Sequence, residues 1–308
     1  MIATRRTFLA AASAVPLLLR GAQVSRARPI RLGGPIFLKS DDPAELAREH
    51  SRLGYSAAYC PAAAANDSDR IRTIKAAFAA ENVVIAEVGA WRNILDPDPK
   101  KRSENLSYVV ERMRLAEAVG ARCCVDIAGS FNPEIWYGPD PRNLSKEFFD
   151  ATVENCRKII DEVKPRNTKF SIEMMPWSLP YGPDSYLELI QAVDRKGFGV
   201  HMDVCNAINS PARFYRNSEV ISELFHTLGK WLLSCHAKDL KWMDEYNVHF
   251  AEVVPGRGQI DYKTYLRELA AAPVEAPLML EHLKTPEEYT EGQEYIRRTG
   301  AAAGVRFV

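Results

Sequence analysis

The sequence predicts an α/β fold in which eight strands alternate with helices and close as a (β/α)8 barrel in a single domain. Short apolar runs alternate with longer helical segments from about residue 30 to residue 298. Four polar residues end four of these runs, Glu173, Asp203, His236 and Glu281, and the spacing between them is near one strand-plus-helix unit. The chain has 308 residues with 46% hydrophobic content, which is enough for one barrel of roughly 250 residues and a leader.

The first half of the chain holds four of the expected strands. Pro43, preceded by two aspartates, opens a helix that Gly54 ends, and Gly120 ends another. We expect strands at 30–37, 55–60, 83–88 and 123–127, helices at 41–53, 68–80 and 104–119, and longer loops at 90–103 and 129–143. The second loop is rich in Gly, Pro and aromatic residues, which is typical of a loop that contacts substrate.

The second half continues the alternation. We expect helices at 146–163, 184–193, 218–228, 262–271 and 286–298, strands at 169–173, 198–203, 231–236 and 278–281, and a loop of about twenty residues after His236. A doubly wound open sheet is the rival fold, and it needs a glycine-rich phosphate turn after its first strand. Gly33 and Gly34 precede no such pattern, so the barrel is preferred.

The N-terminus, residues 1–27, is predicted to be a signal peptide rather than part of the barrel at 28–308. Residues 4–9 (TRRTFL) resemble a twin-arginine export motif, and the apolar stretch at 8–19 is too short to span a membrane. Small residues near Ala22 and Ala27 suit cleavage, although the site is not fixed. An uncleaved anchor or a chance arginine pair are the alternatives. We therefore expect export by the twin-arginine pathway to a periplasmic or extracellular location.

Composition excludes some classes of partner. The 40 Lys and Arg residues balance 40 Asp and Glu residues, so no electrostatic argument favours nucleic acid or an anionic membrane. Most of the six cysteines lie in or beside expected strands, where a thiol is usually a small buried hydrophobe. The sequence has no CxxC pair, so neither a zinc ribbon nor a redox dithiol is indicated, and a disulfide stays open.

The four strand-end residues carry the chemistry. A parallel barrel brings the C-terminal ends of its strands to one mouth, so Glu173, Asp203, His236 and Glu281 should converge there. Three carboxylates and one imidazole make a site for a divalent metal. The sequence therefore predicts a metal-dependent enzyme.

Five segments resemble the xylose-isomerase-like TIM-barrel superfamily, also known as the sugar phosphate isomerase/epimerase family. They are 171–176 (SIEMMP), 201–206 (HMDVCN), 235–239 (CHAKD), 280–282 (LEH) and 255–262 (PGRGQIDY). The resemblance covers roughly residues 30 to 300. The superfamily includes ketose 3-epimerases, inosose dehydratase-like proteins and apurinic endonucleases.

The resemblance implies that Glu173, Asp203, His236 and Glu281 hold one metal, which grips a carbonyl and a neighbouring hydroxyl of a sugar. It also implies that Glu173 and Glu281 act as the acid and base on opposite faces of the substrate. Oxygen-rich ligation with one imidazole favours Mn²⁺, with Mg²⁺ or Co²⁺ as alternatives, whereas Zn²⁺ more often has further His or Cys ligands.

Three residues near these ligands are candidates for substrate contact. Lys238 lies in a His-x-Lys-Asp motif and either contacts substrate oxygens and stabilises an enolate or forms a surface ion pair with Asp239. Asn206 stands where ketose 3-epimerases tend to carry a substrate-binding His. His201 shares a strand face with Asp203, and it either supports the site or is a satisfied barrel histidine.

Loop residues form a second group of candidates. Arg257 either binds a hydroxyl or carboxylate or stiffens its loop. Trp91 and Trp177, with Trp136 and Tyr137, lie in loops at the expected mouth, where aromatic rings commonly stack on sugars; core packing is the alternative. Glu87 is a weaker polar candidate. His282 follows Glu281 and should point away from the metal.

Several functions remain open at this point. The leading hypothesis is a metal-dependent sugar isomerase or epimerase acting by proton transfer next to a carbonyl. The second is a lyase or hydratase on a 3-keto-glycoside or keto-inositol, and the third is an inactive sugar-binding barrel. An apurinic endonuclease needs more metal ligands and a basic face, which this chain lacks. The expected partner is a small sugar or keto sugar, without nucleic acid and without a membrane after export, and a homo-oligomer stays open.

Overall fold

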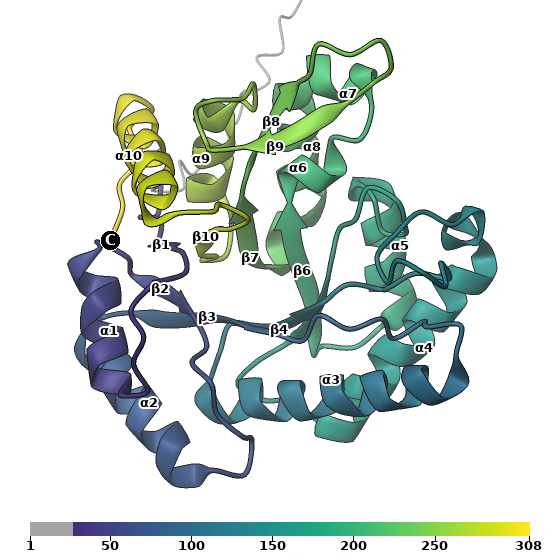
Figure 1. Ribbon diagram of the computed structural model, residues 1–308, viewed down its shortest axis with the longest axis horizontal. Helices are drawn as coiled ribbons and strands as arrows, with labels where there is room; N and C mark the ends of the chain where they lie inside the picture. Colours follow the sequence, from purple (N-terminus) through teal and green to yellow (C-terminus); the bar gives the residue numbers. More distant parts are fainter. Residues whose placement is uncertain (1–26) are drawn as a thin grey trace, which may run out of the picture.

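Eight parallel strands close into a barrel in the computed structural model, which describes residues 27–308 (Figure 1). The strand order around the barrel is β1-β10-β7-β6-β5-β4-β3-β2, and β1 closes it by pairing with both β10 and β2. The predicted (β/α)8 barrel is confirmed. The strands are β1 Leu32–Gly33, β2 Ala57–Tyr59, β3 Val84–Gly89, β4 Cys123–Asp126, β5 Phe170–Glu173, β6 Phe198–Asp203, β7 Leu232–Ala237 and β10 Leu278–Leu280.

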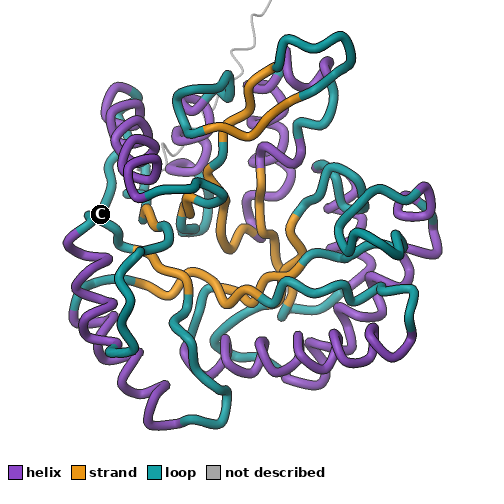
Figure 2. Tube along the Cα trace, viewed as in Figure 1, coloured by secondary structure: helices purple, strands orange, loops and turns teal. Residues whose placement is uncertain are grey.

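Helices surround the strands as an outer layer (Figure 2). Most begin with a side chain that accepts a hydrogen bond from an exposed backbone N–H of the first turn, as Asp67, Ser145 and Thr285 do. They are α1 Pro43–Arg52, α2 Ser68–Ala80, α3 Pro99–Val119, α4 Lys146–Val163, α5 Pro183–Val193, α8 Asn217–Leu228, α9 Tyr262–Ala271 and α10 Pro286–Ala302. The expected bounds of α2, α4 and α9 match these residue for residue.

Several elements differ in length from the sequence prediction, and β1 and α3 show the physical reason. The first strand was expected at 30–37, but β1 is only Leu32–Gly33, because Pro35 has no N–H to donate to a strand ladder. Helix α3 starts at Pro99 rather than near residue 104. The turn-rich residues before it form its start: Asp98 accepts hydrogen bonds from the backbone of Lys100 and Lys101, and Pro99 occupies the first turn.

Several short elements follow the C-terminal ends of the strands, in segments predicted to be irregular. The loop after His236 forms an antiparallel hairpin, β8 Asp239–Trp242 with β9 Phe250–Val253. The others in the described chain are α6 Val204–Ala207, α7 Pro211–Tyr215 and η1 Pro141–Leu144, while η2 Gly229–Trp231 leads into β7. These additions build up the end of the barrel where the predicted site residues lie.

The main hydrophobic core lies between the barrel and its helices, and Ala57, Ala86 and Met279 form a smaller apolar cluster. All six cysteines are free, and five of them are buried, as expected for small apolar residues. Among the described residues we find no helix long and apolar enough to cross a membrane. The predicted signal peptide lies outside the described residues, apart from its last position.

Candidate functional site

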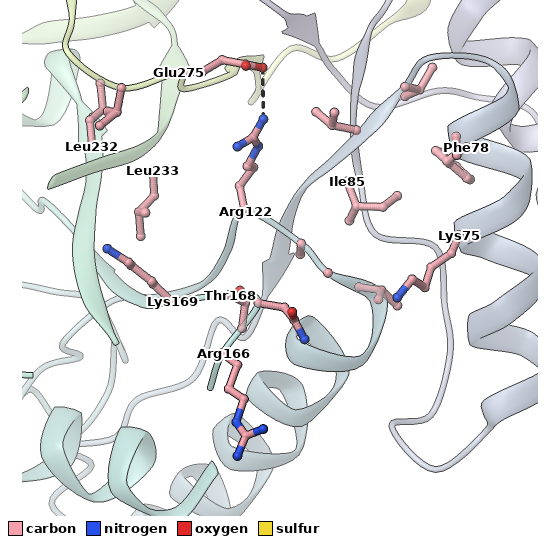
Figure 3. Close-up of a pocket in the computed structure, with 18 of the residues that line it drawn as sticks. Lys75, Phe78, Ile85, Arg122, Arg166, Thr168, Lys169, Leu232, Leu233 and Glu275 are labelled. Carbon is pink, nitrogen blue, oxygen red and sulfur yellow. Dashed lines mark hydrogen bonds and ion pairs between the residues drawn. The ribbon is translucent and has the colours of Figure 1, made fainter. Parts of the chain in front are cut away.

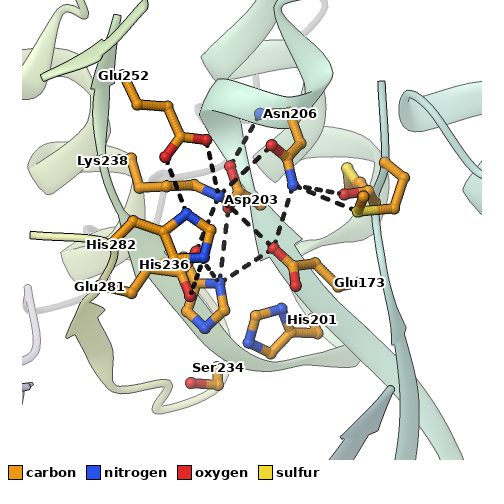
Figure 4. A network of polar contacts seen from close by, with 12 residues as sticks. Glu173, His201, Asp203, Asn206, Ser234, His236, Lys238, Glu252, Glu281 and His282 are labelled. Atoms are coloured by element: carbon orange, nitrogen blue, oxygen red, sulfur yellow. Dashed lines mark hydrogen bonds and ion pairs between the residues drawn. The ribbon is translucent and has the colours of Figure 1, made fainter. Parts of the chain in front are cut away.

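Four strand ends bring the predicted ligand set together (Figure 4). Glu173, Asp203, His236 and Glu281 each offer one atom, and these four atoms lie within 4.8 Å of one another. The Nδ1 atom of His236 lies 2.9 Å from Glu281 Oε1, 3.1 Å from Glu173 Oε1 and 3.6 Å from Asp203 Oδ2. The four residues come from β5, β6, β7 and the position just after β10.

Strand register accounts for this convergence. Asp203 pairs with His236 across β6 and β7, and His236 pairs with Met279 of β10, two residues before Glu281. Asp203 also caps α6, because its Oδ1 accepts the N–H of Asn206 at 2.9 Å. Buried Tyr265 of α9 donates its hydroxyl to the backbone carbonyl of His236 and so fixes the end of β7 from outside.

The donor set fits a divalent cation. Asp203 Oδ2 and Glu281 Oε1 are buried and accept no hydrogen bond of good geometry, although both lie within ion-pair distance of His236 Nδ1 and of Lys238 Nζ. Buried carboxylate oxygens are usually hydrogen-bonded or bound to a metal. Three carboxylates with one imidazole suit Mn²⁺, Mg²⁺ or Co²⁺.

Lys238 is the nearest cation to this cluster. Its side chain is almost fully buried, and Nζ lies 2.7 Å from Asp203 Oδ2, 2.8 Å from Glu281 Oε1 and 3.9 Å from Glu173 Oε1. Although burial opposes the charged form, these carboxylates hold the pKa of Lys238 well above its ordinary value. Lys238 is therefore a buried ammonium group among the candidate ligands.

The alternative of a surface ion pair between Lys238 and Asp239 is wrong. Asp239 is buried and accepts backbone N–H groups of Leu240, Gly256, Gly258 and Ile260. The two side chains diverge at the junction between β7, which ends at Ala237, and β8, which begins at Asp239, and they have different partners. Asp239 thus fixes the loop at 255–262, while Lys238 faces the mouth with His236.

A buried hydrogen-bond network contacts the Nε2 atom of His236, on the side of the ring that faces away from the cluster. Glu87 of β3 is fully buried, with Oε2 3.3 Å from His236 Nε2 and Oε1 3.0 Å from His201 Nε2; Ser234 also donates to it. Burial opposes ionisation of Glu87, but the two imidazoles lower its pKa overall. A carboxylate that accepts a hydrogen bond from one ring nitrogen leaves the other, Nδ1, directed at a metal.

The sequence prediction gave Glu87 little weight. A glutamate between Ala86 and Val88 in an apolar run is nevertheless a signal of a paired buried charge.

His201 lies within this network, not in the open mouth. Its side chain is completely buried, and its ring centroid is 4.2 Å from that of His236. The structure therefore places His201 behind the ligand cluster, where it contacts Glu87.

A cavity of about 680 Å³ opens above the cluster. Of the predicted substrate-binding residues, it is lined by Trp91, Asn206, Lys238 and Trp177, beside the candidate ligands Glu173 and Glu281. Asn206 donates from Nδ2 to Glu173 Oε1 at 3.2 Å and to the carbonyl of Met174 at 2.9 Å. The Trp91 ring lies 6.3 Å from that of His236, between centroids.

Arg257 and His282 lie differently from expectation. Arg257 does not line this cavity; it pairs with Glu291 at 2.7 Å and borders a smaller adjoining cavity of about 160 Å³. The expectation that His282 points away is wrong, because the strand ends at Leu280 and His282 has a φ of 60°. Strand alternation no longer applies there, and His282 lines the main cavity with its Nδ1 2.8 Å from Glu252.

The electrostatics of the cluster are asymmetric. Burial is the largest influence on both glutamates and favours the neutral form. At Glu173 burial prevails, helped by the nearby charge of Glu281, and the pKa is raised. At Glu281 the charges of His236 and Lys238 outweigh burial and lower the pKa to about 2.

Another cavity, of about 760 Å³, lies at the opposite end of the barrel, beside the residues that begin β3 and β7 (Figure 3). Its one lining carboxylate, Glu275, pairs with Arg122 at 3.1 Å. No imidazole lines it. Barrel enzymes carry their chemistry at the C-terminal end of the strands, so the cavity of about 680 Å³ above the cluster is the candidate active site.

Residues 47–299 match a family model described as xylose isomerase-like TIM barrel. An uncharacterized protein of Methanocaldococcus jannaschii is 26% identical over 142 residues, which is 42% of this chain and 44% of that protein. The chain thus matches less than half the length of this curated relative.

Solved structures share the fold. A xylose isomerase-like TIM barrel protein from Mycobacterium smegmatis, in complex with magnesium, has a TM-score of 0.62 at 19% identity, with 84% of this chain and 88% of that chain covered. The 3-keto-D-glucoside 4-epimerase of E. coli has a TM-score of 0.62 at 14% identity, with 87% of this chain and 99% of that chain covered. A probable 3-DHS dehydratase of Bacillus anthracis has a TM-score of 0.60 at 15% identity, with 85% of this chain and 94% of that chain covered. At these identities the likeness establishes the fold alone.

Proposed function

The chain belongs to the xylose isomerase-like TIM barrel family, and from this premise we propose that it is a divalent-metal-dependent sugar isomerase or epimerase. The observation that carries the proposal is the convergence of Glu173, Asp203, His236 and Glu281 within 4.8 Å under an open cavity. The family neighbour solved as a magnesium complex and the keto-glucoside epimerase of the same fold support it.

The metal would be held by these four residues, with Mn²⁺ favoured on the donor set and Mg²⁺ or Co²⁺ as alternatives. When bound, it supplies Lewis acidity that polarises a substrate carbonyl and makes the neighbouring C–H acidic. Glu87 holds His236 Nε2, so that Nδ1 stays available to the cation.

Glu173 and Glu281 are proposed as the acid and base pair that moves the proton. Both line the cavity, and in the barrel β5 and β10 are separated by β6 and β7, so the two carboxylates approach a bound sugar from different sides. A base on one face removes the proton next to the carbonyl, and an acid on the other face returns it. Lys238, between them, donates hydrogen bonds to substrate oxygens that gain negative charge.

Metal content is the decisive measurement. We expect elemental mass spectrometry to find about one divalent ion per chain in the wild type, and much less in His236→Ala and Glu281→Gln. Glu252→Gln is the matched control, because Glu252 lines the cavity but is not in the four-residue cluster. Absence of metal in the wild type, with no thermal shift on adding Mn²⁺, refutes the proposal.

Proton transfer is tested separately in D₂O. With the metal-loaded protein, the proton next to the carbonyl of a keto sugar should exchange for deuterium, which removes its proton NMR signal. Glu173→Gln and Glu281→Gln should each abolish this exchange. A metal-loaded protein that exchanges no proton in any keto sugar would instead support a binding protein.

A metal-dependent lyase or hydratase on a 3-keto-glycoside or keto-inositol is the second candidate. The observation that favours it is the His282–Glu252 pair at the rim, 2.8 Å apart, which can donate a proton to a leaving group. The probable dehydratase of the same fold agrees with it. Release of an aglycone separates this reaction from epimerisation.

Location and partners complete the proposal. We propose export through the twin-arginine pathway from the pattern in residues 4–27, and a small sugar as the partner instead of nucleic acid. Fractionation of cells that express the chain with Arg5 and Arg6 changed to Lys tests export, since the variant should stay in the cytoplasm.

A further inference from the structure

The candidate active-site cavity has two chemically different halves. Around the cluster, its lining is polar: Glu173, Asn206, Lys238, Glu252, Glu281 and His282. The remaining lining is mostly apolar and aromatic: Tyr59, Trp91 and Met175 lie beside the cluster, and the outer half consists of Ile127, Trp136, Tyr137, Pro176 and Trp177. No charged residue belongs to that outer half.

Three aromatic rings on the outer side are unusually open to solvent. Trp136 is 40% exposed, Tyr137 50% and Trp177 58%, and the first two meet edge to face with ring centroids 5.3 Å apart. They come from two different loops, after β4 and after β5. Apolar groups gathered at the rim of a pocket are characteristic of a binding surface.

The loop that carries Trp136 and Tyr137 is tied down. Buried Asn143 donates from Nδ2 to Ser130 Oγ at 2.9 Å and to the carbonyl of Gly138 at 3.0 Å. Asn132 Oδ1 accepts the backbone N–H groups of residues 134 and 135, both at 2.9 Å. The rings are therefore presented by an internally hydrogen-bonded loop, which lowers the entropic cost of binding.

The cavity is larger than a single sugar ring requires. Pockets in this range hold drug-sized ligands with both an apolar body and a few polar groups. A second sugar in the outer half can stack one face on these rings, but its hydroxyls find few polar partners in this lining. A flat apolar group matches the outer half better.

We propose that the substrate is a glycoside whose sugar ring carries a carbonyl and whose apolar, ring-containing aglycone lies against Trp136, Tyr137 and Trp177. Its sugar lies over Lys238 and the carboxylate cluster. This inference rests on the proposed function for the sugar end, while the aglycone end depends on the outer wall alone.

The test compares binding of phenyl β-glucoside, methyl β-glucoside and cellobiose, used as unreactive analogues, to the full chain by titration calorimetry. We expect the phenyl compound to bind at least about tenfold more tightly than the methyl compound, as burial of one aromatic ring allows. The double variant Trp136→Ala/Trp177→Ala should lose about fivefold to tenfold for phenyl and little for methyl. Tyr215→Ala is the control, since Tyr215 is an exposed ring outside the cavity.

Equal affinities for phenyl and methyl glucoside, tighter binding of cellobiose, or no measurable binding of any of the three overturn the inference. An unchanged phenyl affinity in the double variant overturns it too. Because Trp136 and Trp177 are both exposed, the double variant should keep the fold of the wild type, and thermal unfolding verifies this. Failure of the proposed function is distinguishable, because it appears as missing metal and missing proton exchange while the phenyl preference persists.

Discussion

Replacing Lys238 with Met tests whether the buried ammonium balances the carboxylate cluster. Methionine keeps much of the side-chain volume but removes the charge that lies 2.7 Å from Asp203 and 2.8 Å from Glu281. Breaking a buried ion pair from one side costs about 3–5 kcal/mol, because the remaining charge stays buried without a partner. His236 alone would then compensate these oxygens.

The expected cost converts into a melting temperature. Unfolding entropy of roughly 2.1 cal/mol/K per residue gives about 0.6 kcal/mol/K for a chain of this size. Lys238→Met should therefore melt about 5–8 °C below the wild type in a chelator, as measured by calorimetry. Addition of Mn²⁺ should restore most of the loss, because a divalent cation supplies the missing positive charge.

The metal response is the sharper part of this experiment. In the wild type a bound cation must share Asp203 and Glu281 with the ammonium, so Mn²⁺ should raise the melting temperature by less than it does in Lys238→Met. Lys241→Met is the control, since Lys241 is exposed in β8. A variant that melts like the wild type in the chelator, or gains no more from Mn²⁺, refutes the reasoning.

Three further changes probe the surroundings of the cluster. Glu87→Gln weakens the acceptor for His236 Nε2, so metal affinity should fall about tenfold to a hundredfold in chelator competition; unchanged affinity would mean that Glu87 has only a packing role. Gly89→Ala places a Cβ 2.2 Å from Trp91 Nε1, so the ring should shift and KM should rise at unchanged metal content; loss of metal would contradict a local effect. Burial raises the pKa of Asp126 to about 8, so its carboxyl stays protonated in the fold while the unfolded chain has released that proton, and stability should fall as pH rises from about 4 to 8. Asp126→Asn should flatten this slope in urea unfolding, and an equal slope in both proteins would exclude Asp126 as its source.

The ligand cluster could be predicted because it depends on local sequence patterns. Apolar runs mark strands, and the residue at the C-terminal end of each run lies at one mouth once the barrel topology is known. These two facts were sufficient to place Glu173, Asp203 and His236 at the mouth. The partner of Lys238 could not be predicted in this way, because Lys238 lies between the end of β7 and the start of β8.

Other features depend on backbone angles and on partners distant in sequence. His282 lines the cavity because the strand has ended and its φ is positive, which alternation does not reveal. The β8–β9 hairpin pairs only with itself, so no barrel periodicity marks it. Glu87 acquires its role from His201 and His236, which are more than a hundred residues away.

Part of the aromatic wall of the cavity comes from a loop that supplies no residue to the cluster. The cluster is built on β5, β6, β7 and the end of β10, whereas Trp136 and Tyr137 come from residues 129–143, a loop that contributes nothing to the cluster. On the proposed function, this loop can therefore change its contacts to the aglycone without changing the residues that act on the sugar. Exchange of residues 129–143 between relatives is expected to alter aglycone preference and to leave the metal content unchanged.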